Sequence, residues 1–124
     1  MTRVWMAVWC MGLLVGCGHK HDHDHEQDDG ASFYTEDEHI ERYPETYCAF
    51  LERCQPDTLA DSYEGDVTVC ETSFEEWLTD RLSTCEYDGE ASAACLNALP
   101  TADCAEWTNS DGALQAACGS IIDC

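Results

Sequence analysis

Four histidines alternate with other residues near the start of the chain, and no other residues here are as well suited to chemistry. They are His19, His21, His23 and His25, with Asp22 and Asp24 between them. Imidazole nitrogens bind Zn²⁺, Cu²⁺ and Ni²⁺, and alternate residues of an extended chain project to one side about 6.6 Å apart. The pattern therefore predicts weak, rapidly exchanging divalent-metal binding. The competing interpretation is a soluble linker, because nothing in the sequence preorganises these histidines.

Cysteine is the second residue type with chemical potential. The chain has 10 cysteines, and eight of them lie in its last 77 residues: Cys48, Cys54, Cys70, Cys85, Cys95, Cys104, Cys118 and Cys124. An even number at this density is typical of small exported domains that close disulfides in an oxidising compartment. Zinc modules place about two to four residues between paired cysteines, and this chain has wider gaps everywhere. The spacing therefore predicts disulfides, and the absence of Cys-x-x-Cys argues against a thioredoxin-like redox role.

A short apolar run that ends in a cysteine indicates export. Arg3 is followed by an apolar stretch from Val4 to Gly16, which together have the parts of a secretory signal. These 13 residues are too few to cross a bilayer, which takes about 20. The junction itself is Leu14-Val15-Gly16-Cys17. This Leu-small-small-Cys pattern resembles the lipobox of bacterial lipoproteins.

The lipobox resemblance implies a specific processing of the amino terminus. The peptide before Cys17 would be removed, Cys17 would carry diacylglycerol on its sulfur, and the new amino group would commonly receive a palmitate-like chain. Two or three acyl chains give stable anchoring. We therefore expect a lipid-anchored protein of the cell envelope, at the outer membrane on its periplasmic or outer face. A plain secretory signal and a buried apolar helix are the alternatives.

The chain is strongly acidic. It has 26 Asp and Glu against 5 Lys and Arg, a formal net charge of −21, and the loss of Arg3 with the signal makes this −22. Nucleic acid is excluded and anionic lipid surfaces are disfavoured, because phosphate contacts would be repulsive. The plainest interpretation is a solvated, self-repelling surface. Basic protein partners and cationic ligands are the remaining options, and a monomer is expected.

Composition divides the chain into three regions. We predict a signal peptide at 1–16, a lipidated, disordered His- and Asp-rich tether at 17–42, and a Cys-rich helical domain at 43–124. The tether lacks the hydrophobic periodicity that would offset the cost of ordering it. Within it, the stretch from Thr35 to Glu41 is expected to be a weak helix or coil. Order is expected to begin at Pro44, which suits a first helical turn.

Apolar residues at helical spacing predict the elements of the domain. The expected helices span 44–54, 67–85, 91–99, 101–107 and 113–118. A loop is expected from Pro56 to Gly65, and the second helix starts at Asp66 or at a capping box of Thr68 and Glu71. Its apolar stripe includes Trp77, and that of the third helix includes Ala94. We therefore expect an all-α bundle of four or five short helices, braced by four disulfides.

Two cysteines on the first predicted helix constrain the disulfides. Cys48 and Cys54 would stand about 9 Å apart along the axis and roughly 240° around it. A disulfide rarely joins Cα atoms more than about 6.8 Å apart. These two therefore cannot pair, and their helix must connect to two different neighbours. Hairpin geometry favours Cys54 with Cys70 and, less strongly, Cys85 with Cys95, which leaves Cys48 for the C-terminal segment.

The layout of residues 43–124, together with the lipobox, resembles the small Cys-rich lipoproteins of deltaproteobacteria such as myxobacteria. The matching features are the Cys48/Cys54 helix, Cys70 near a helix start, Cys95 in an Ala-rich helix, and the closing Cys104, Cys118 and Cys124. That family has no established activity. The resemblance therefore implies fold and location, and it implies no functional residue beyond Cys17.

We expect no enzymatic activity. No histidine lies beyond His39, bridged cysteines cannot act as nucleophiles, and no Gly-rich phosphate loop is present. Glu71 and Glu75 could in principle do acid and base work, but one turn apart on an exposed helix they are expected to be solvated charge. Two functions remain: a structural or interaction module at the envelope, or a metal-buffering lipoprotein that uses the histidine tract.

Overall fold

The computed structural model describes residues 31–124, which form a helical bundle with one very small sheet. The helices are α1 (Glu36–Cys54), α2 (Pro56–Tyr63), α3 (Val67–Leu82), α4 (Gly89–Ala98), the 3-10 helix η1 (Leu99–Thr101), α5 (Cys104–Thr108) and α6 (Ala113–Gly119). The strands β1 (Glu86–Tyr87) and β2 (Ile122–Asp123) pair antiparallel. The predicted all-α, disulfide-braced architecture is confirmed, with six α-helices in the described residues where four or five were expected.

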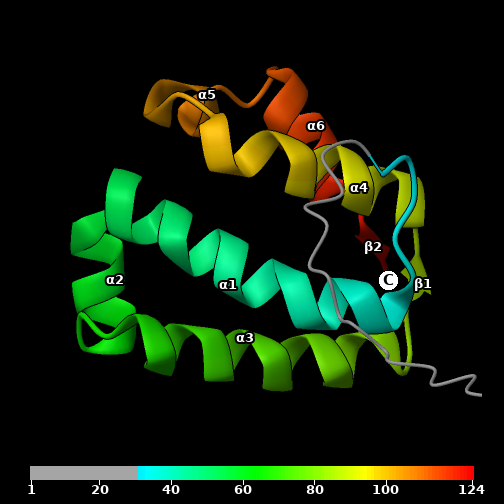
Figure 1. The fold of residues 1–124 in the computed structure, drawn as a ribbon, viewed down its shortest axis with the longest axis horizontal. Helices are drawn as coiled ribbons and strands as arrows, with labels where there is room; N and C mark the ends of the chain where they lie inside the picture. Colours follow the sequence, from blue (N-terminus) through cyan, green and yellow to red (C-terminus); the bar gives the residue numbers. More distant parts are fainter. Residues whose placement is uncertain (1–30) are drawn as a thin grey trace, which may run out of the picture.

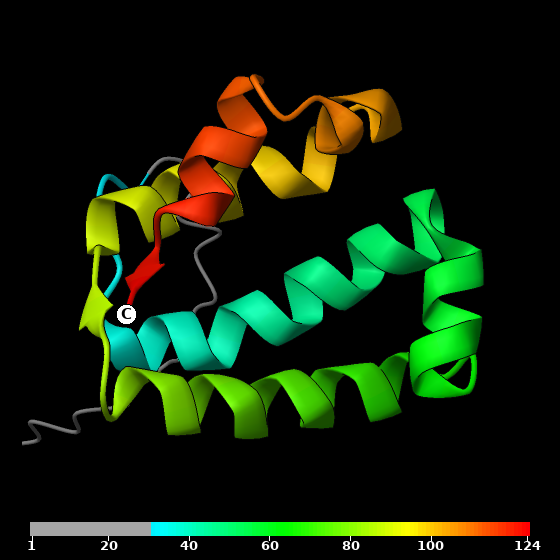
Figure 2. The ribbon, with the colours of Figure 1, turned by 180° about the vertical axis from the view of Figure 1, so that it is seen from behind.

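The helices are arranged in two layers that meet along α1. In Figure 1, α1 and α3 lie side by side and antiparallel, and α2 crosses between them at one end. Helices α4, α5 and α6 lie on the other side of α1. Figure 2 shows the β1–β2 ribbon and the C-terminus at the end where α1 begins. We call α1, α2 and α3 the long-helix layer, and α4, η1, α5 and α6 the short-helix layer.

Helix α1 begins earlier than predicted. The Thr35 hydroxyl accepts a hydrogen bond from the backbone N–H of Glu38, and the Glu38 carboxylate accepts one from the N–H of Thr35 at 2.8 Å. This capping box satisfies two N–H groups that a helix start leaves unpaired. The helix therefore starts at Glu36 and carries Pro44 in its interior. The stretch from Thr35 to Glu41, expected as a weak helix or coil, is therefore helical from Glu36, and the disorder expected up to residue 42 and the start of order expected at Pro44 are wrong.

The segment ahead of α1 packs against α4. Tyr34 is 4% exposed, and its backbone N–H donates to the carbonyl of Gly89 at 3.1 Å. The side-chain amide of Asn97 donates to the carbonyl of Ala31 at 2.8 Å. A Cβ at position 89 would collide with the Tyr34 carbonyl and the Phe33 ring, so only glycine fits. The chain therefore enters the domain along α4, held there from residue 31.

Helix α2 occupies a stretch that the sequence predicted as loop. Pro56 stands in its first turn, where the missing N–H costs nothing. Leu59 is its single buried residue, and it packs against Cys48 and Cys70. The chain then turns through Gly65, whose φ of 74° suits glycine. One buried residue in eight gives no periodic pattern, which explains why sequence inspection missed this helix.

Aspartates cap α3 and α4. Asp66 accepts two backbone hydrogen bonds at the start of α3, which confirms the first of the two predicted starts, and Asp88 does the same for α4. Two residues predicted on apolar faces are exposed instead, Trp77 at 46% and Ala94. On α4, Ser92 is buried and Ala94 is not, because the face of α4 that packs against α1 places the Ser92 hydroxyl beside the buried imidazole of His39.

All eight cysteines of the domain form disulfides. The bridges are Cys48–Cys70, Cys54–Cys104, Cys85–Cys124 and Cys95–Cys118. Cys48 reaches α3 and Cys54 reaches α5, so the prediction that α1 connects two different neighbours is confirmed. The bridges tie each layer internally, tie the layers together, and close the sheet.

The predicted partners, however, are wrong. Cys54 does not pair with Cys70, Cys85 does not pair with Cys95, and Cys48 does not reach the C-terminal segment. The reason is that α2 inserts a turn between α1 and α3, which places Cys70 opposite Cys48. The C-terminal strand returns beside β1, so Cys85 meets the end of the chain.

The main core lies between the two layers. Its buried members are Phe50, Cys95, Leu99, Ala102, Leu114 and Ile121. A second cluster within the long-helix layer surrounds the Cys48–Cys70 bridge, and a third holds Tyr34 against Ala93. A domain of this size has a small core, so we attribute much of its stability to the bridges.

Candidate functional site

The two sequence features with the strongest functional signal lie outside the described residues. They are the proposed lipid attachment residue Cys17 and the histidines His19, His21, His23 and His25. Within residues 31–124 there is no group of three or more His, Cys, Asp or Glu side chains placed to hold a metal ion. In the same residues, no helix combines the length and apolar character needed to cross a membrane.

A buried histidine and serine form the one catalytic-like pair in the domain. His39 is 1% exposed and Ser92 is 0% exposed, and their Nδ1 and Oγ atoms lie 2.7 Å apart. Helix α1 supplies the imidazole because its capping box extends it back over residue 39. Helix α4 supplies the hydroxyl from its second turn. The hydrogen bond therefore joins the two layers.

Aromatic rings enclose this pair. The His39 imidazole lies 4.8 Å from the ring of Tyr43 and 5.6 Å from that of Tyr87, measured between centroids. The Tyr87 hydroxyl donates to the carbonyl of Tyr34 at 2.9 Å, which holds the entering segment over the site. The His39 imidazole therefore lies between aromatic side chains of α1 and β1, and the Tyr87 hydroxyl ties the entering segment to the same place.

Burial sets the charge state of His39. Desolvation lowers the pKa of its imidazole from 6.5 to about 4, so the ring is neutral at pH 7. A neutral imidazole beside a serine hydroxyl is the arrangement of a nucleophilic hydrolase, but there the Oγ must be open to substrate. Here both side chains are closed off from solvent. The contact is therefore positioned to hold α1 against α4.

A chain of aromatic rings continues from this pair through the core. Tyr43 and Tyr47 stack with centroids 5.4 Å apart, and Tyr47 also lies 4.8 Å from Phe74 and 5.4 Å from Trp107. Desolvation raises the pKa of the Tyr43 and Tyr47 phenols, so both stay protonated at neutral pH. We call these four residues the aromatic cluster. It supplies packing between α1, α3 and α5.

Every arginine in the described residues lies over an aromatic ring. Arg42 lies over Tyr34, Arg53 over Phe50, and Arg81 over Trp77, with 5.0 to 5.7 Å from guanidinium carbon to ring centroid.

Arg53 also donates to the carbonyls of Leu99 and Ala102 at 3.1 and 3.0 Å, which caps the end of η1. These three arginines therefore stabilise packing within the domain, and the more numerous carboxylates dominate its surface charge.

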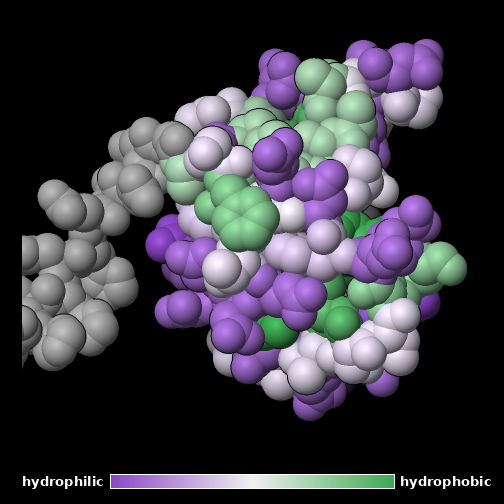
Figure 3. All heavy atoms as spheres, turned by 90° about the vertical axis from the view of Figure 1, so that its right-hand side faces the viewer, coloured by the Kyte–Doolittle hydropathy of each residue, from purple (hydrophilic) through white to green (hydrophobic). Residues whose placement is uncertain are grey.

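The carboxylates are distributed over the exterior. Glu71 and Glu75 lie one turn apart on α3, where Glu71 is half-buried and Glu75 is exposed, and an open depression follows the same helix. It is lined by Thr72, Glu75, Glu76, Thr79, Asp80 and Ser83. Figure 3 shows the end of the molecule that carries the ribbon, where hydrophilic surface surrounds separate hydrophobic patches. The depression is open and lies on a single helix, so it does not enclose a substrate.

No known protein family, no curated protein and no solved structure matches this chain. The arrangement of the site residues is therefore interpreted from their own geometry.

Sequence inspection missed the buried pair. The predicted tether at 17–42 includes His39, and the apolar face predicted for the 91–99 helix contains Ala94 and not Ser92. The signal that could have found His39 is the Thr35-x-x-Glu38 capping pattern, since it extends the helix to include residue 39. No local signal marks Ser92, because its burial depends on the packing of α4 against α1.

Proposed function

We propose that this chain is an exported, lipid-anchored protein of the cell envelope whose disulfide-braced domain acts as a structural or interaction module. The observation that carries the proposal is the closed set of four disulfides downstream of the Leu14–Cys17 junction. Disulfides persist in oxidising compartments. Because these bridges use all eight cysteines from Cys48 to Cys124, the proposal assigns Cys17 to lipid attachment.

The place where the chain enters the domain supports a short tether. Asn97 holds the backbone at Ala31, and the 14 residues from Cys17 to Gly30 reach at most about 50 Å when fully extended. An anchored domain would therefore stay near the membrane, while its acidic exterior is repelled by anionic lipid. This arrangement presents the domain to basic soluble or surface partners.

The interior of the domain supports a recognition or spacer role over catalysis. The His39 and Ser92 side chains are enclosed, and burial keeps the two phenols of the aromatic cluster, Tyr43 and Tyr47, protonated. What the domain offers to other molecules is a rigid, acidic exterior. Rigid exteriors suit binding, because little conformational entropy is lost on association.

The anchor is tested by the intact mass of the protein isolated from membranes, before and after reduction and alkylation. We expect a chain that starts at Cys17, carries two or three acyl chains, and shows no reactive thiol until it is reduced. The Cys17→Ala variant should lose the acyl mass and leave the membrane fraction. Cys10→Ala is the matched control, because that residue lies in the removed peptide. A chain that retains Met1, or an unacylated Cys17, would contradict the proposal.

A second candidate is divalent-metal binding by the histidine tract, favoured by the alternation of four histidines. Calorimetric titration of the mature protein with Zn²⁺ or Ni²⁺ tests it, against a variant that lacks residues 19–25. We expect binding heat only from the intact tract, and loss of binding below about pH 6 as the imidazoles protonate. Equal heats from both proteins would end this candidate.

A further inference from the structure

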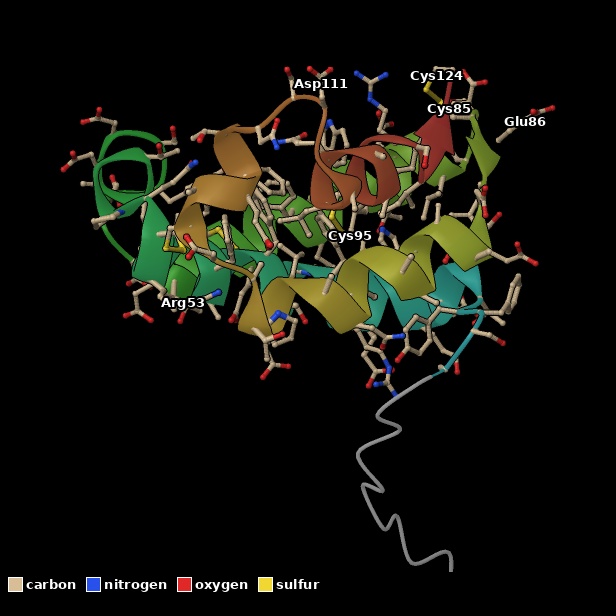
Figure 4. All side chains as sticks on the ribbon, turned by 90° about the horizontal axis from the view of Figure 1, so that it is seen from above. Arg53, Cys85, Glu86, Cys95, Asp111 and Cys124 are labelled. Carbon is tan, nitrogen blue, oxygen red and sulfur yellow. A yellow bond between two sulfur atoms is a disulfide. The ribbon has the colours of Figure 1, made fainter. Side chains whose placement is uncertain are left out.

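The four disulfides differ in their exposure. Cys48 and Cys70 are both 0% exposed, and Cys95 is also 0% exposed. By contrast, Cys124 is exposed and its partner Cys85 is half-buried. Figure 4 shows the same difference, with Cys85 and Cys124 at the rim of the molecule and Cys95 among the helices. Thiol–disulfide exchange requires that a thiolate reach a sulfur, so exposure is the first condition for reactivity.

A cation lies beside the sulfur of the exposed Cys124. The Nη1 atom of Arg81 is 3.7 Å from the Sγ atom of Cys124, and the same guanidinium lies over the exposed ring of Trp77. An approaching thiolate is an anion and is repelled by the acidic exterior, so a guanidinium at this point attracts it locally. The hydroxyl of Thr84 lies 3.7 Å from the Sγ atom of Cys85. This hydroxyl donates to the carbonyl of Arg81 at 3.3 Å, and it can turn to donate to the Cys85 sulfur if that sulfur becomes a thiolate.

The other bridge with an exposed cysteine lacks this arrangement. Cys104 is exposed and its partner Cys54 is half-buried. Arg53 adjoins Cys54 in sequence, but its two terminal nitrogens donate to the backbone carbonyls at the end of η1. Exposure alone therefore does not distinguish the two bridges, and the placement of Arg81 does.

We propose that the Cys85–Cys124 disulfide is a site of exchange with external thiols, and that an incoming thiolate attacks Cys124. Attack on the Cys124 sulfur breaks the bond to Cys85, which leaves as a thiolate with both bonding electrons and then takes a proton from solvent. The product is a mixed disulfide between Cys124 and the attacking thiol. With a dithiol reagent or a dithiol protein, the second thiolate displaces Cys124, and the dithiol becomes oxidised to its own disulfide.

Opening this bridge leaves the rest of the fold in place. The last strand contributes only two paired residues, whereas Ile121 just ahead of it is 3% exposed and its carbonyl accepts from the N–H of Asp88 at 2.8 Å. Ile121 therefore stays in the core while residues 122–124 are released. The freed Cys124 would be a covalent attachment point for a thiol partner, and Cys85 would remain on the domain to displace that partner.

Timed reduction tests the proposal on the mature, fully oxidised protein. Samples treated with limiting dithiothreitol are alkylated at intervals, and the labelled cysteines are located by mass spectrometry. We expect Cys85 and Cys124 to be labelled first, while the other six wait for denaturant. Trp77 fluorescence should change with the same rate constant, because the ring shares Arg81 with this bridge. Earlier labelling of Cys54 and Cys104 would overturn the proposal.

The role of Arg81 and the point of attack have separate readouts. Arg81→Gln should slow the labelling of the pair by about threefold or more, and Arg81→Lys should restore most of the rate because it keeps the charge. Arg42→Gln removes the same charge from an arginine that lies over Tyr34 and makes no recorded contact with this bridge, and it should leave the rate unchanged. Equal rates for Arg81→Gln and Arg42→Gln would remove Arg81 from the proposal. A monothiol, 2-mercaptoethanol, should be trapped on Cys124; trapping on Cys85 would reverse the assigned direction of attack.

Discussion

Two disulfides that close loops of nearly equal length lie in unlike surroundings. Cys48–Cys70 spans 22 residues and joins α1 to α3, which are 19 and 16 residues long. Cys95–Cys118 spans 23 residues and joins α4 to α6, which are 10 and 7 residues long. The constraint that each places on the unfolded chain is therefore almost the same. What differs is how much structure the connected helices hold without the bridge.

The difference teaches which layer depends on cross-linking. Isolated helices shorter than about 12 residues are marginal in water, and every helix of the short-helix layer is below that length. The long-helix layer has extended contact between α1 and α3, reinforced by the aromatic cluster. In the short-helix layer the apolar contacts come from a few residues such as Leu114 and Ile121. We infer that the bridges there are needed to keep the helices docked.

The largest expected effect on stability comes from removing one or the other of these two bridges. Replacing Cys48 and Cys70 by alanine should lower the free energy of unfolding by about 3 kcal/mol, the value that loop entropy assigns to a loop of this length. Replacing Cys95 and Cys118 should cost about 4 to 5 kcal/mol, because α6 also loses its docking. Chemical denaturation measures both values. Hydrogen exchange should show lost protection in α6 only for the second variant, and equal protection losses would contradict the comparison.

The next effect concerns the contact between layers at His39. Burial lowers its pKa to about 4 in the folded state, against 6.5 as the ordinary value. The unfolded state therefore binds more protons between these two pH values, so stability is complete above pH 6.5 and decreases as the pH falls towards 4. The decrease attributable to this residue should approach about 3 kcal/mol.

Denaturation of the wild type and of His39→Gln at several pH values isolates this contribution. The surface carboxylates titrate in both proteins, so their effects cancel in the difference. We expect the two unfolding free energies to converge as the pH is lowered from 7 to 4. A difference that stays constant over this range would show that His39 does not titrate as its burial requires.

A smaller effect is expected at the hydrogen bonds that Arg53 makes between the layers. Arg53→Met keeps the aliphatic part of the side chain over Phe50 but removes two hydrogen bonds to the carbonyls of Leu99 and Ala102. We expect a loss of about 1 to 2 kcal/mol in unfolding free energy, reduced by the partial exposure of the site. Arg42→Met, a change at an arginine over Tyr34, is the matched control and should cost less. Equal losses would mean that the carbonyl contacts add nothing.

Helix boundaries show where sequence inspection succeeded. The ends of α1 before Gln55, of α4 near Pro100 and of α6 at Gly119 follow from residues that stop or cap a helix through their own backbone chemistry. The Asp66 cap was predicted for the same reason. The start of α1 is also encoded locally, by the Thr35 and Glu38 capping box, although the predicted helix starts at Pro44. This boundary could therefore have been predicted from the sequence.

Other features were beyond local patterns. Helix α2 has one buried residue, so its helicity depends on the packing of Leu59 against side chains of α1 and α3. The exposure of Trp77 and the burial of Ser92 depend on which face of each helix meets a neighbour. The disulfide partners depend on the order in which the layers stack, and hairpin reasoning from adjacent helices therefore chose wrong pairs.

The amino-acid sequence by itself determined the helical class, the closed set of eight bridging cysteines, and the impossibility of a bond between Cys48 and Cys54. These follow from residue spacing, composition and the fixed dimensions of a helix. Only the tertiary structure decided the pairing of those cysteines, the buried contact of His39 with Ser92, and the placement of Arg81 beside Cys124. Each of these joins residues more than 20 positions apart, and such distances in space are set by how the layers pack, which local spacing does not encode.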